Sequence, residues 1–178
     1  MTIPVLETFL MSTGPTSGPD DSTTTVITSG IISARLILQA GPGGDFLNGS
    51  SGDDVLNGGA GDDLIEGMQG DDTLEGNAGT DVLSYYHSDA PVTVNLGSQG
   101  TAQNVGGSAG TDTFTGFENI YGSNAGNDSL GNGDSLVGNG RENRILGYDG
   151  DDIIRGGGGN DDLLGMKGND FLAGGRWK

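Results

Sequence analysis

The chain has little of what most small proteins use to stabilise a fold. It contains no cysteine, which excludes disulfide bonds. With only one histidine as well, the usual ligand sets for zinc are excluded. Aromatic residues make up 6% and hydrophobic residues 32% of its 178 residues, which is too lean for a thick globular core. We therefore expect one domain that is stabilised by something other than disulfides or a large core.

Positive charge is also scarce. The chain has 7 Lys and Arg against 25 Asp and Glu, for a net charge of −18. This charge argues against nucleic acid as a partner and against docking on anionic lipid. The apolar segment 3–11 is too short to cross a bilayer, and no basic region precedes it as in a signal peptide. We expect no membrane insertion and export without a cleaved N-terminal signal peptide.

Glycine is abundant instead, and it recurs at fixed intervals. Residues 49–84 read GSSGDDVLN, GGAGDDLIE, GMQGDDTLE and GNAGTDVLS. Each of these nine-residue units has Gly at positions 1 and 4, Asp at position 6 and a large aliphatic residue at position 8. The pattern extends back through 40–48 and returns over 138–173 as GNGRENRIL, GYDGDDIIR, GGGGNDDLL and GMKGNDFLA. A fixed period found twice in one chain indicates a repeat architecture.

Each unit predicts one short strand and one turn. The residues around position 8 alternate as in a strand, with the aliphatic side chain pointing inward. The glycines before them permit the positive φ angles that the turn needs. If two units close one coil of about eighteen residues, equivalent positions stack roughly 4.8 Å apart. Asp45, Asp63 and Asp81 then line one edge of the coil, and Asp54 and Asp72 line the other.

Stacked carboxylates need a cation between them. Two such groups repel by roughly 3 kcal/mol at about 5 Å and an effective dielectric near 20. No Lys or Arg lies between Ala40 and Gly140 to offset this repulsion. Ca²⁺ fits best, because it takes about six to eight oxygen ligands and these loops offer carboxylates and unhindered carbonyls. Mg²⁺ is disfavoured because it tends to keep its water ligands.

The units resemble the glycine-rich calcium-binding nonapeptide repeats of RTX proteins. The resemblance implies an all-β fold: a right-handed parallel β-roll (a β-solenoid) of nine-residue repeats, interrupted here by an irregular β insert. It also implies several Ca²⁺ ions held between successive loops, with sixth-position residues as ligands. The expected ligands are Asp45, Asp54, Asp63, Asp72, Asp81, Asn143, Asp152, Asp161 and Asp170.

Three parts of this ligand set depart from the regular pattern. The loop of Asp45 contains Pro42. In the loop of Asn143 an amide replaces the acid and Arg141 stands at position 4, which weakens the expectation of an ion there. Asp128 is added to the set from a segment where the nine-residue spacing slips, and Asp134 in the same segment is left open.

Four segments are expected. Residues 1–39 hold an apolar segment and a Ser/Thr/Gly/Pro linker, 40–84 the first roll block, 85–137 the insert and a distorted coil, and 138–178 the second block. Within the insert, PVTVNL at 91–96 predicts a half-buried strand and TDTFTGFENIY at 111–121 a looser coil. The apolar run 26–38 has two interpretations, a cap on the first coil or a strand that pairs with another subunit. Two short rolls and one roll with a bulge both stay open.

No catalytic constellation is evident. GDSL at 133–136 and GGSAG at 106–110 match nucleophile strings of hydrolases, but the second lacks the strand and helix that a nucleophile elbow needs. His87 has no second histidine or cysteine beside it. We expect that the protein is not an enzyme.

Two function classes follow. The first is a secreted structural protein that folds on binding Ca²⁺ and stacks head to tail into a homo-oligomer or filament, or on a cell surface. The alternative, which the family resemblance implies, is a folding and export module of a larger type I-secreted RTX enzyme, toxin or adhesin. Both place the chain outside the cell or at its surface, where calcium fills sites that bind at about 10⁻⁴–10⁻³ M. About forty residues precede the repeats, too few for an enzyme domain, which favours the first class.

Overall fold

A computed structural model describes residues 8–11, 25–26, 35–125 and 133–175. Within these ranges nearly all regular structure is β-strand, with two short 3₁₀ turns, η1 (Leu96–Ser98) and η2 (Gly107–Ala109), and no α-helix. This part of the chain accordingly holds no helix that is long and apolar enough to span a membrane. The all-β class predicted from the repeats is confirmed for the described residues.

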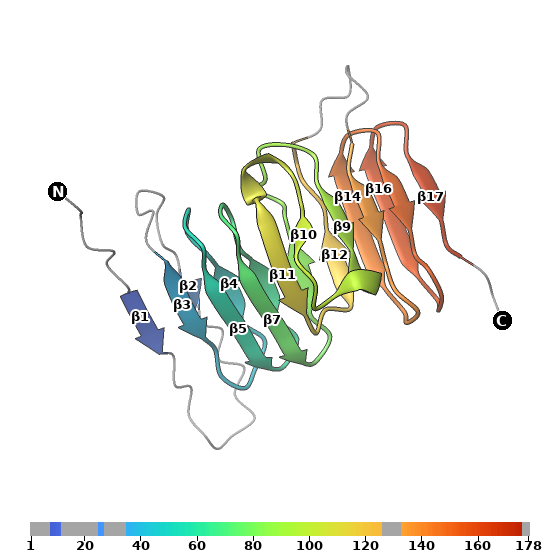
Figure 1. Cartoon of the computed structure of the whole chain (residues 1–178). Coiled ribbons are helices and arrows are strands. Elements are labelled where there is room, and N and C mark those ends of the chain that lie inside the picture. The colour runs from blue at the N-terminus through green and yellow to red at the C-terminus, as the bar shows by residue number, and fades with distance from the viewer. Residues whose placement is uncertain (1–7, 12–24, 27–34, 126–132, 176–178) are drawn as a thin grey trace.

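The strands form three sheets, and within the molecule the strands follow one another from the N-terminal to the C-terminal end (Figure 1). The first sheet has the order β1 (Thr8–Met11), β3 (Leu36–Gln39), β5 (Val55–Ala60), β7 (Thr73–Ala78), β11 (Thr111–Thr115) and β10 (Gln103–Asn104). The second sheet has the order β2 (Thr25–Val26), β4 (Phe46–Asn48), β6 (Leu64–Glu66), β8 (Val82–Ser84), β12 (Asn119–Tyr121), β14 (Arg144–Asp149) and β16 (Asp162–Lys167). The third sheet has the order β9 (Thr93–Asn95), β13 (Ser135–Val137), β15 (Ile153–Arg155) and β17 (Phe171–Ala173).

The pairing follows the period of two repeat units. The chain alternates between the first and second sheets up to β8, and between the second and third sheets from β13 onward. Every pair of strands is parallel except β10 with β11. Leu56 lies beside Leu74 and Ile154 beside Leu172, so equivalent residues of successive coils are neighbours. These parallel pairs are what a β-roll of RTX repeats requires.

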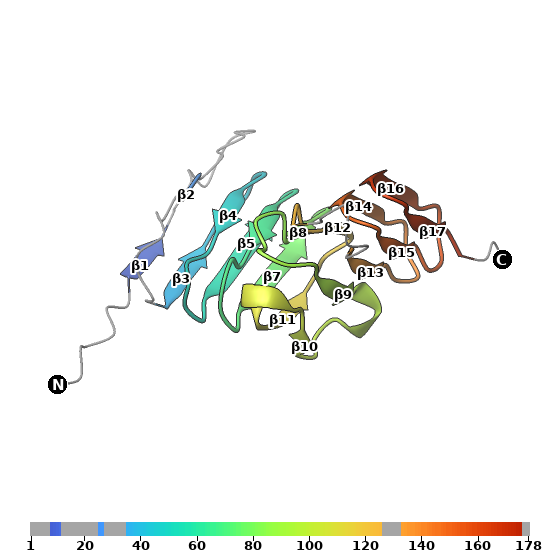
Figure 2. The ribbon, with the colours of Figure 1, turned by 90° about the horizontal axis from the view of Figure 1, so that it is seen from above.

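The two repeat blocks share one sheet. β12 of the insert pairs with β8 of the first block on one side and with β14 of the second block on the other. On the opposite side of the stack, the first sheet ends at β11 and β10 while the third sheet begins at β9, and Figure 2 shows this change from above. The insert therefore interrupts one side of the stack and leaves the other side continuous.

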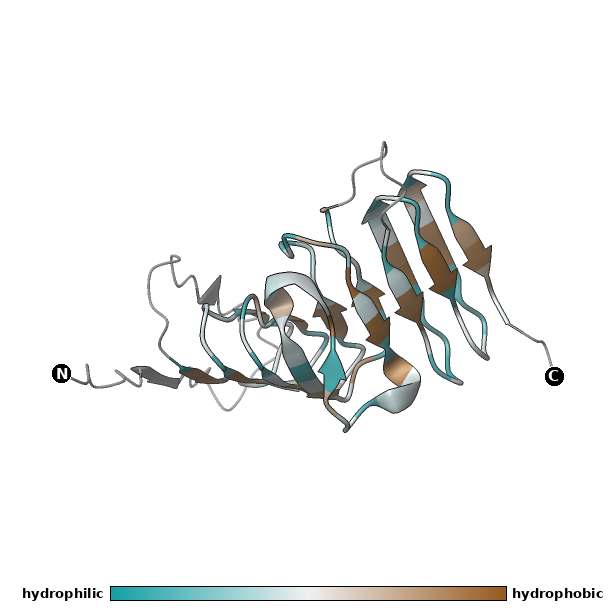
Figure 3. Cartoon of the chain, turned by 45° about the horizontal axis from the view of Figure 1, so that its top comes forward, coloured by the Kyte–Doolittle hydropathy of each residue, from teal (hydrophilic) through white to brown (hydrophobic). Residues whose placement is uncertain are grey.

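The core contains a row of aliphatic residues, each of which occupies position 8 of its repeat unit. Leu56, Ile65, Leu74 and Leu83 have no exposed surface, and apolar colour runs across the strands in Figure 3 while the loops are polar. The insert continues this row with larger side chains such as Phe114. In the predicted strand of the insert, Val92, Val94 and Leu96 are all buried and Thr93 is exposed, which confirms the alternation.

Candidate calcium sites

The acids at position 6 lie at the edges of the sheets, where the loops of successive coils meet. Carboxylates are usually exposed to solvent, but most of these position-6 carboxylates are buried. The residues exposed by 2% or less are Asp45, Asp54, Asp63, Asp72, Asp81 and Asp152, together with Asn143. Asp161 and Asp170 are half-buried. Burial of so many acids requires that their oxygens be satisfied by hydrogen bonds or by a cation.

One oxygen of each carboxylate is satisfied by the coil before it. Oδ1 of Asp63 accepts a 2.8 Å hydrogen bond from the backbone N–H of Asp45, and Oδ1 of Asp81 accepts one from Asp63. A second series begins at Asp54, whose N–H donates to Oδ1 of Asp72 at 2.8 Å. In the second block, the N–H groups of Asp134, Asn143 and Asp152 donate in the same way to Asp152, Asp161 and Asp170. The acids therefore form columns along both edges of the stack.

The other oxygen divides the acids into two groups. In the first group Oδ2 is buried and has no hydrogen-bond partner; its members are Asp63, Asp72, Asp81, Asp152 and Asp161. In the second group both oxygens accept hydrogen bonds from the protein. Asp54 receives N–H bonds from Ser50 and Leu36, and Asp134 receives them from Ser123 and Val92. Of these two groups, only the first has an acceptor oxygen without a protein partner.

The backbone at position 2 of each loop explains the division. This residue has a left-handed φ in each loop whose acid has an unpartnered oxygen: Gly59 (101°), Met68 (75°), Asn77 (71°), Tyr148 (74°) and Gly157 (100°). Ser50 is outside the left-handed region, and its N–H donates to Oδ2 of Asp54 at 2.5 Å. The loop thus has two forms, one in which position 2 caps the carboxylate and one in which the oxygen stays open.

The open oxygens lie against the position-1 glycines of their loops, and in two loops a backbone carbonyl of the next coil lies at the same glycine. A methyl group placed on Gly147, at position 1 of its loop, would lie within 3.0 Å of Oδ2 of Asp152 and of the Gly165 carbonyl oxygen in the next coil. At Gly76 the same group would meet Oδ2 of Asp81 and the carbonyl oxygen of Gly116. Position 1 must therefore be glycine in these two loops. Carboxylate and carbonyl oxygens from successive coils form the type of ligand set that Ca²⁺ prefers.

Three of these carboxylates hold protons more tightly than free aspartate when no cation is present. Burial raises the pKa of Asp72 to about 8, of Asp152 to about 7 and of Asp63 to about 6. Neighbouring carboxylates raise the pKa of Asp72 further, since Asp54 and Asp112 lie in the same column. A bound cation would reverse both effects by favouring the ionised form.

The side chains by themselves do not form a cage. Among the residues that the structure describes, no three His, Cys, Asp or Glu side chains converge to hold a metal ion. An ion between two coils would therefore take most of its ligands from backbone carbonyls. The glycine content fits this, because glycine leaves the carbonyl oxygens accessible.

The insert contributes residues to the columns that the repeat spacing does not identify. Asp112 accepts the N–H of Asp72 through Oδ1, and its Oδ2 accepts the hydroxyl of buried Tyr85 at 2.8 Å. Glu118 accepts the N–H of Asp81, and Asp134, left open in the sequence, stands in the third sheet's column. Each lies two residues before a buried apolar residue, as Asp72 does before Leu74, and that spacing is the signal for them. The predicted ligand Asp128 lies outside the described residues.

Parallel strands in register, buried position-6 acids and carboxylate oxygens beside backbone carbonyls are the features expected of a calcium-binding repeat protein. The family model for the RTX calcium-binding nonapeptide repeat matches residues 39–74, 58–85 and 137–172. Both blocks of the chain therefore carry RTX calcium-binding nonapeptide repeats, and repeats of this family bind Ca²⁺. No curated protein matches the chain.

Proposed function

We propose that the chain is a secreted structural protein, a right-handed β-roll that folds when Ca²⁺ binds between its coils. The observation that carries this proposal is the set of five buried aspartate oxygens without a protein partner, at Asp63, Asp72, Asp81, Asp152 and Asp161. A buried, unsatisfied carboxylate is costly, and a cation removes that cost. Because the ions bind only the folded chain, their binding free energy becomes folding free energy.

The five open aspartates are the strongest candidates among the predicted ligands. Asp45 and Asp170 extend their columns, since Asp45 donates to Asp63 and Asp170 accepts from Asp152. Asp54 already accepts hydrogen bonds on both oxygens, so an ion beside it would compete with Ser50. We therefore expect fewer ions than sixth-position residues.

A calcium titration of the full chain tests the proposal. In chelator the circular dichroism spectrum should be coil-like and the hydrodynamic radius expanded. Millimolar CaCl₂ should produce a compact β-rich state, and MgCl₂ at the same concentration should not. A compact β-rich chain in chelator at low salt and pH 8 would contradict the coupling of folding to calcium.

The location outside the cell is part of the proposal. RTX repeat proteins are typically secreted. Cytosolic calcium is too dilute for sites that bind at about 10⁻⁴–10⁻³ M, so the chain would fold only after export. Detection of the chain in the culture medium of cells that express its gene would support this location.

We further propose that copies stack head to tail. Within the described residues, no strand pairs with the outer edge of β16 or β17. The last coil exposes 52% of Met166, 57% of Phe171 and 45% of Leu172. At the other end of the stack, β1 and β2 are the outer strands of the first two sheets. A second copy that offers β1 and β2 to β17 and β16 would continue the parallel pairing, and such a contact repeats without closing. No catalytic activity is part of this proposal.

A further inference from the structure

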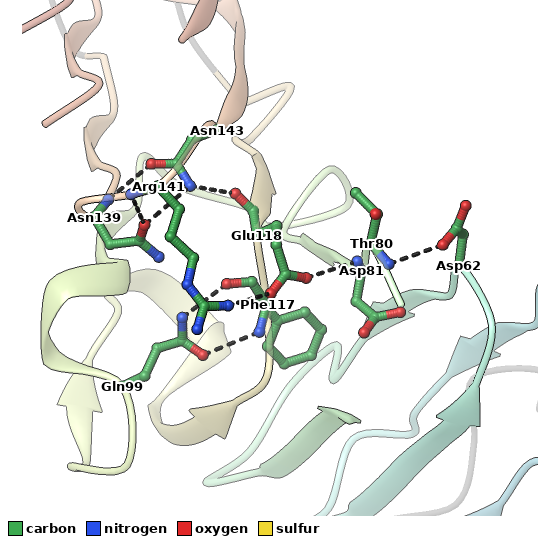
Figure 4. A network of polar contacts seen from close by, with 9 residues as sticks. All are labelled: Asp62, Thr80, Asp81, Gln99, Phe117, Glu118, Asn139, Arg141 and Asn143. Carbon is green, nitrogen blue, oxygen red and sulfur yellow. Dashed lines mark hydrogen bonds and ion pairs between the residues drawn. The ribbon is translucent and has the colours of Figure 1, made fainter. Parts of the chain in front are cut away.

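The second repeat block meets the insert at a joint that differs from the regular eighteen-residue steps of the stack (Figure 4). At the joint, Ile120 of β12 pairs with Ile145 of β14, across 25 residues instead of the usual eighteen. The sixth-position residues on the two sides are Glu118 and Asn143. At the regular steps of this edge, such as Asp63 on Asp81, both residues are aspartates.

The hydrogen bond between the two coils runs in the opposite direction at the joint. At regular steps the carboxylate accepts an N–H from the preceding coil. Asn143 instead donates from Nδ2 to the carbonyl oxygen of Glu118 at 2.6 Å. Its Oδ1 accepts the N–H of Asn139, at position 2 of its own loop, at 2.8 Å. Asn143 is 2% exposed, and its amide leaves no open carboxylate oxygen for an ion.

Glu118 connects the joint to the first block. One of its oxygens, Oε2, accepts the N–H of Asp81 at 3.0 Å. The other, Oε1, lies 3.7 Å from a guanidinium nitrogen of Arg141. Arg141 occupies position 4, which is glycine in the other units of the second block. Asn143 is neutral and Arg141 offsets Glu118, so the joint carries no net charge, whereas Asp63 and Asp81 together carry two negative charges when ionised.

Asn143 and Arg141 both replace regular repeat residues, and of the two the Asn143 amide contributes more to the contact between the coils. The Arg141 side chain is 78% exposed beside a cleft of about 710 Å³, so solvent screens its ion pair with Glu118. The Asn143 amide is buried, and the hydrogen bonds around it are backed by a side-chain contact between coils. Asn119 Oδ1 accepts the N–H of Arg144 at 2.8 Å, in place of a backbone carbonyl. The polar groups of both coils at the joint therefore have hydrogen-bond partners within the protein.

We propose that the joint is an ion-free clamp, in which the Asn143 amide and the Arg141 guanidinium replace the calcium ion between the two coils. The blocks on either side bind calcium, while the joint couples them through protein contacts alone. This inference rests on the proposed calcium binding of the blocks.

The number of bound ions at saturating calcium tests the clamp, and native mass spectrometry of the full chain counts them. Asn143→Ala should leave the number unchanged. The double variant Arg141→Gly/Asn143→Asp restores the regular residues at positions 4 and 6. Asn139 at position 2 can then take the left-handed φ that Asn77 has in its own loop, which opens the new carboxylate oxygen, so this variant should bind one ion more than the wild type. Asn104→Asp makes the same amide-to-acid change at an exposed residue of β10, outside the columns, and should leave the number unchanged.

The possible results distinguish a failure of the ion-free clamp from a failure of the proposed calcium binding. Loss of an ion in Asn143→Ala would show that the natural joint holds calcium and would overturn the clamp. A double variant that folds and gains no ion would also overturn it. A wild-type chain that binds no calcium would instead contradict the proposed function.

Discussion

The backbone N–H of Asp54 donates a 2.8 Å hydrogen bond to Oδ1 of Asp72, one coil further along the same column. The two acids are equally buried, but their second oxygens differ. Oδ2 of Asp54 accepts the N–H of Ser50, and Oδ2 of Asp72 has no partner. The same residue type at the same repeat position is thus satisfied by the protein in one coil and left open in the next.

This difference predicts that Asp72→Asn and Asp54→Asn have unequal effects. Asp72→Asn removes a charged ligand with an open oxygen, so we expect the loss of one bound ion and a fall in calcium affinity on the order of tenfold. Asp54→Asn should keep the number of ions, because Ser50 already occupies its Oδ2. Isothermal titration calorimetry gives both quantities, and equal losses in the two variants would contradict the division of the acids.

A second prediction compares the effect on stability of replacing glycine at position 4 and at position 3 of a loop. Gly70 has φ of 120°, and a Cβ there would collide with the Gly52 carbonyl in the preceding coil. Gly70→Ala should lower the free energy of unfolding in calcium by about 2 kcal/mol or more. Gly140, at position 3 of its loop, has open space where its Cβ would lie and is outside the positive-φ region. Gly140→Ala should leave stability unchanged or slightly higher, and urea unfolding in constant CaCl₂ measures both.

The repeat columns made much of this arrangement predictable from the sequence. Nine-residue spacing placed Leu56 beside Leu74 and Asp63 beside Asp81, because identical positions of a regular coil must stack. The insert does not keep this nine-residue spacing, so its neighbours could not be predicted in the same way. Asp72 and Asp112 are neighbours across 40 residues, so no fixed period connects them. The loop forms were also hidden, because the capping by Ser50 depends on its φ angle, which the repeat pattern does not specify.

A third prediction concerns pH in the absence of calcium. The pKa values of Asp72, Asp152 and Asp63 are raised from 3.8 to about 8, 7 and 6 in the folded chain. The folded chain therefore binds more protons than the unfolded chain between about pH 4 and 8. Their contribution to stability is fully present below about pH 4 and is lost as pH rises through these raised values. In chelator, β structure should increase when pH falls from 8 to 4.5.

Calcium should show the opposite dependence on pH. The ion needs ionised carboxylates, so its binding releases protons and weakens as pH falls. Between pH 8 and 6 the affinity should fall by up to about tenfold per pH unit for each proton displaced. Calorimetry in buffers of different ionisation enthalpy counts those protons. An affinity that is constant from pH 8 to 6 would contradict the raised pKa values.

The last prediction tests head-to-tail stacking. Leu172 continues the position-8 row above Ile154, yet it is 45% exposed while Ile154 is fully buried. Covering this side chain with another copy would contribute about 1 kcal/mol, in addition to backbone pairing along β16 and β17. With calcium, the wild type should therefore form long assemblies that sedimentation and electron microscopy detect. Leu172→Glu should bind the same number of ions and stay monomeric, because a carboxylate would be buried at the contact.

Phe46→Glu provides the matched control for this variant. Phe46 is 50% exposed on β4, which has partner strands on both sides and is not one of the outer strands β1, β2, β16 and β17 that would make the contact. The Phe46→Glu variant makes the same change from an apolar to an acidic side chain as Leu172→Glu, and it should assemble like the wild type. Chelator should dissolve the assemblies of both proteins, because the coils that make the contact need calcium to form. If the wild type stays monomeric at high concentration in millimolar CaCl₂, stacking is wrong, and a calcium-dependent export module of a larger secreted protein becomes the better explanation of the repeats.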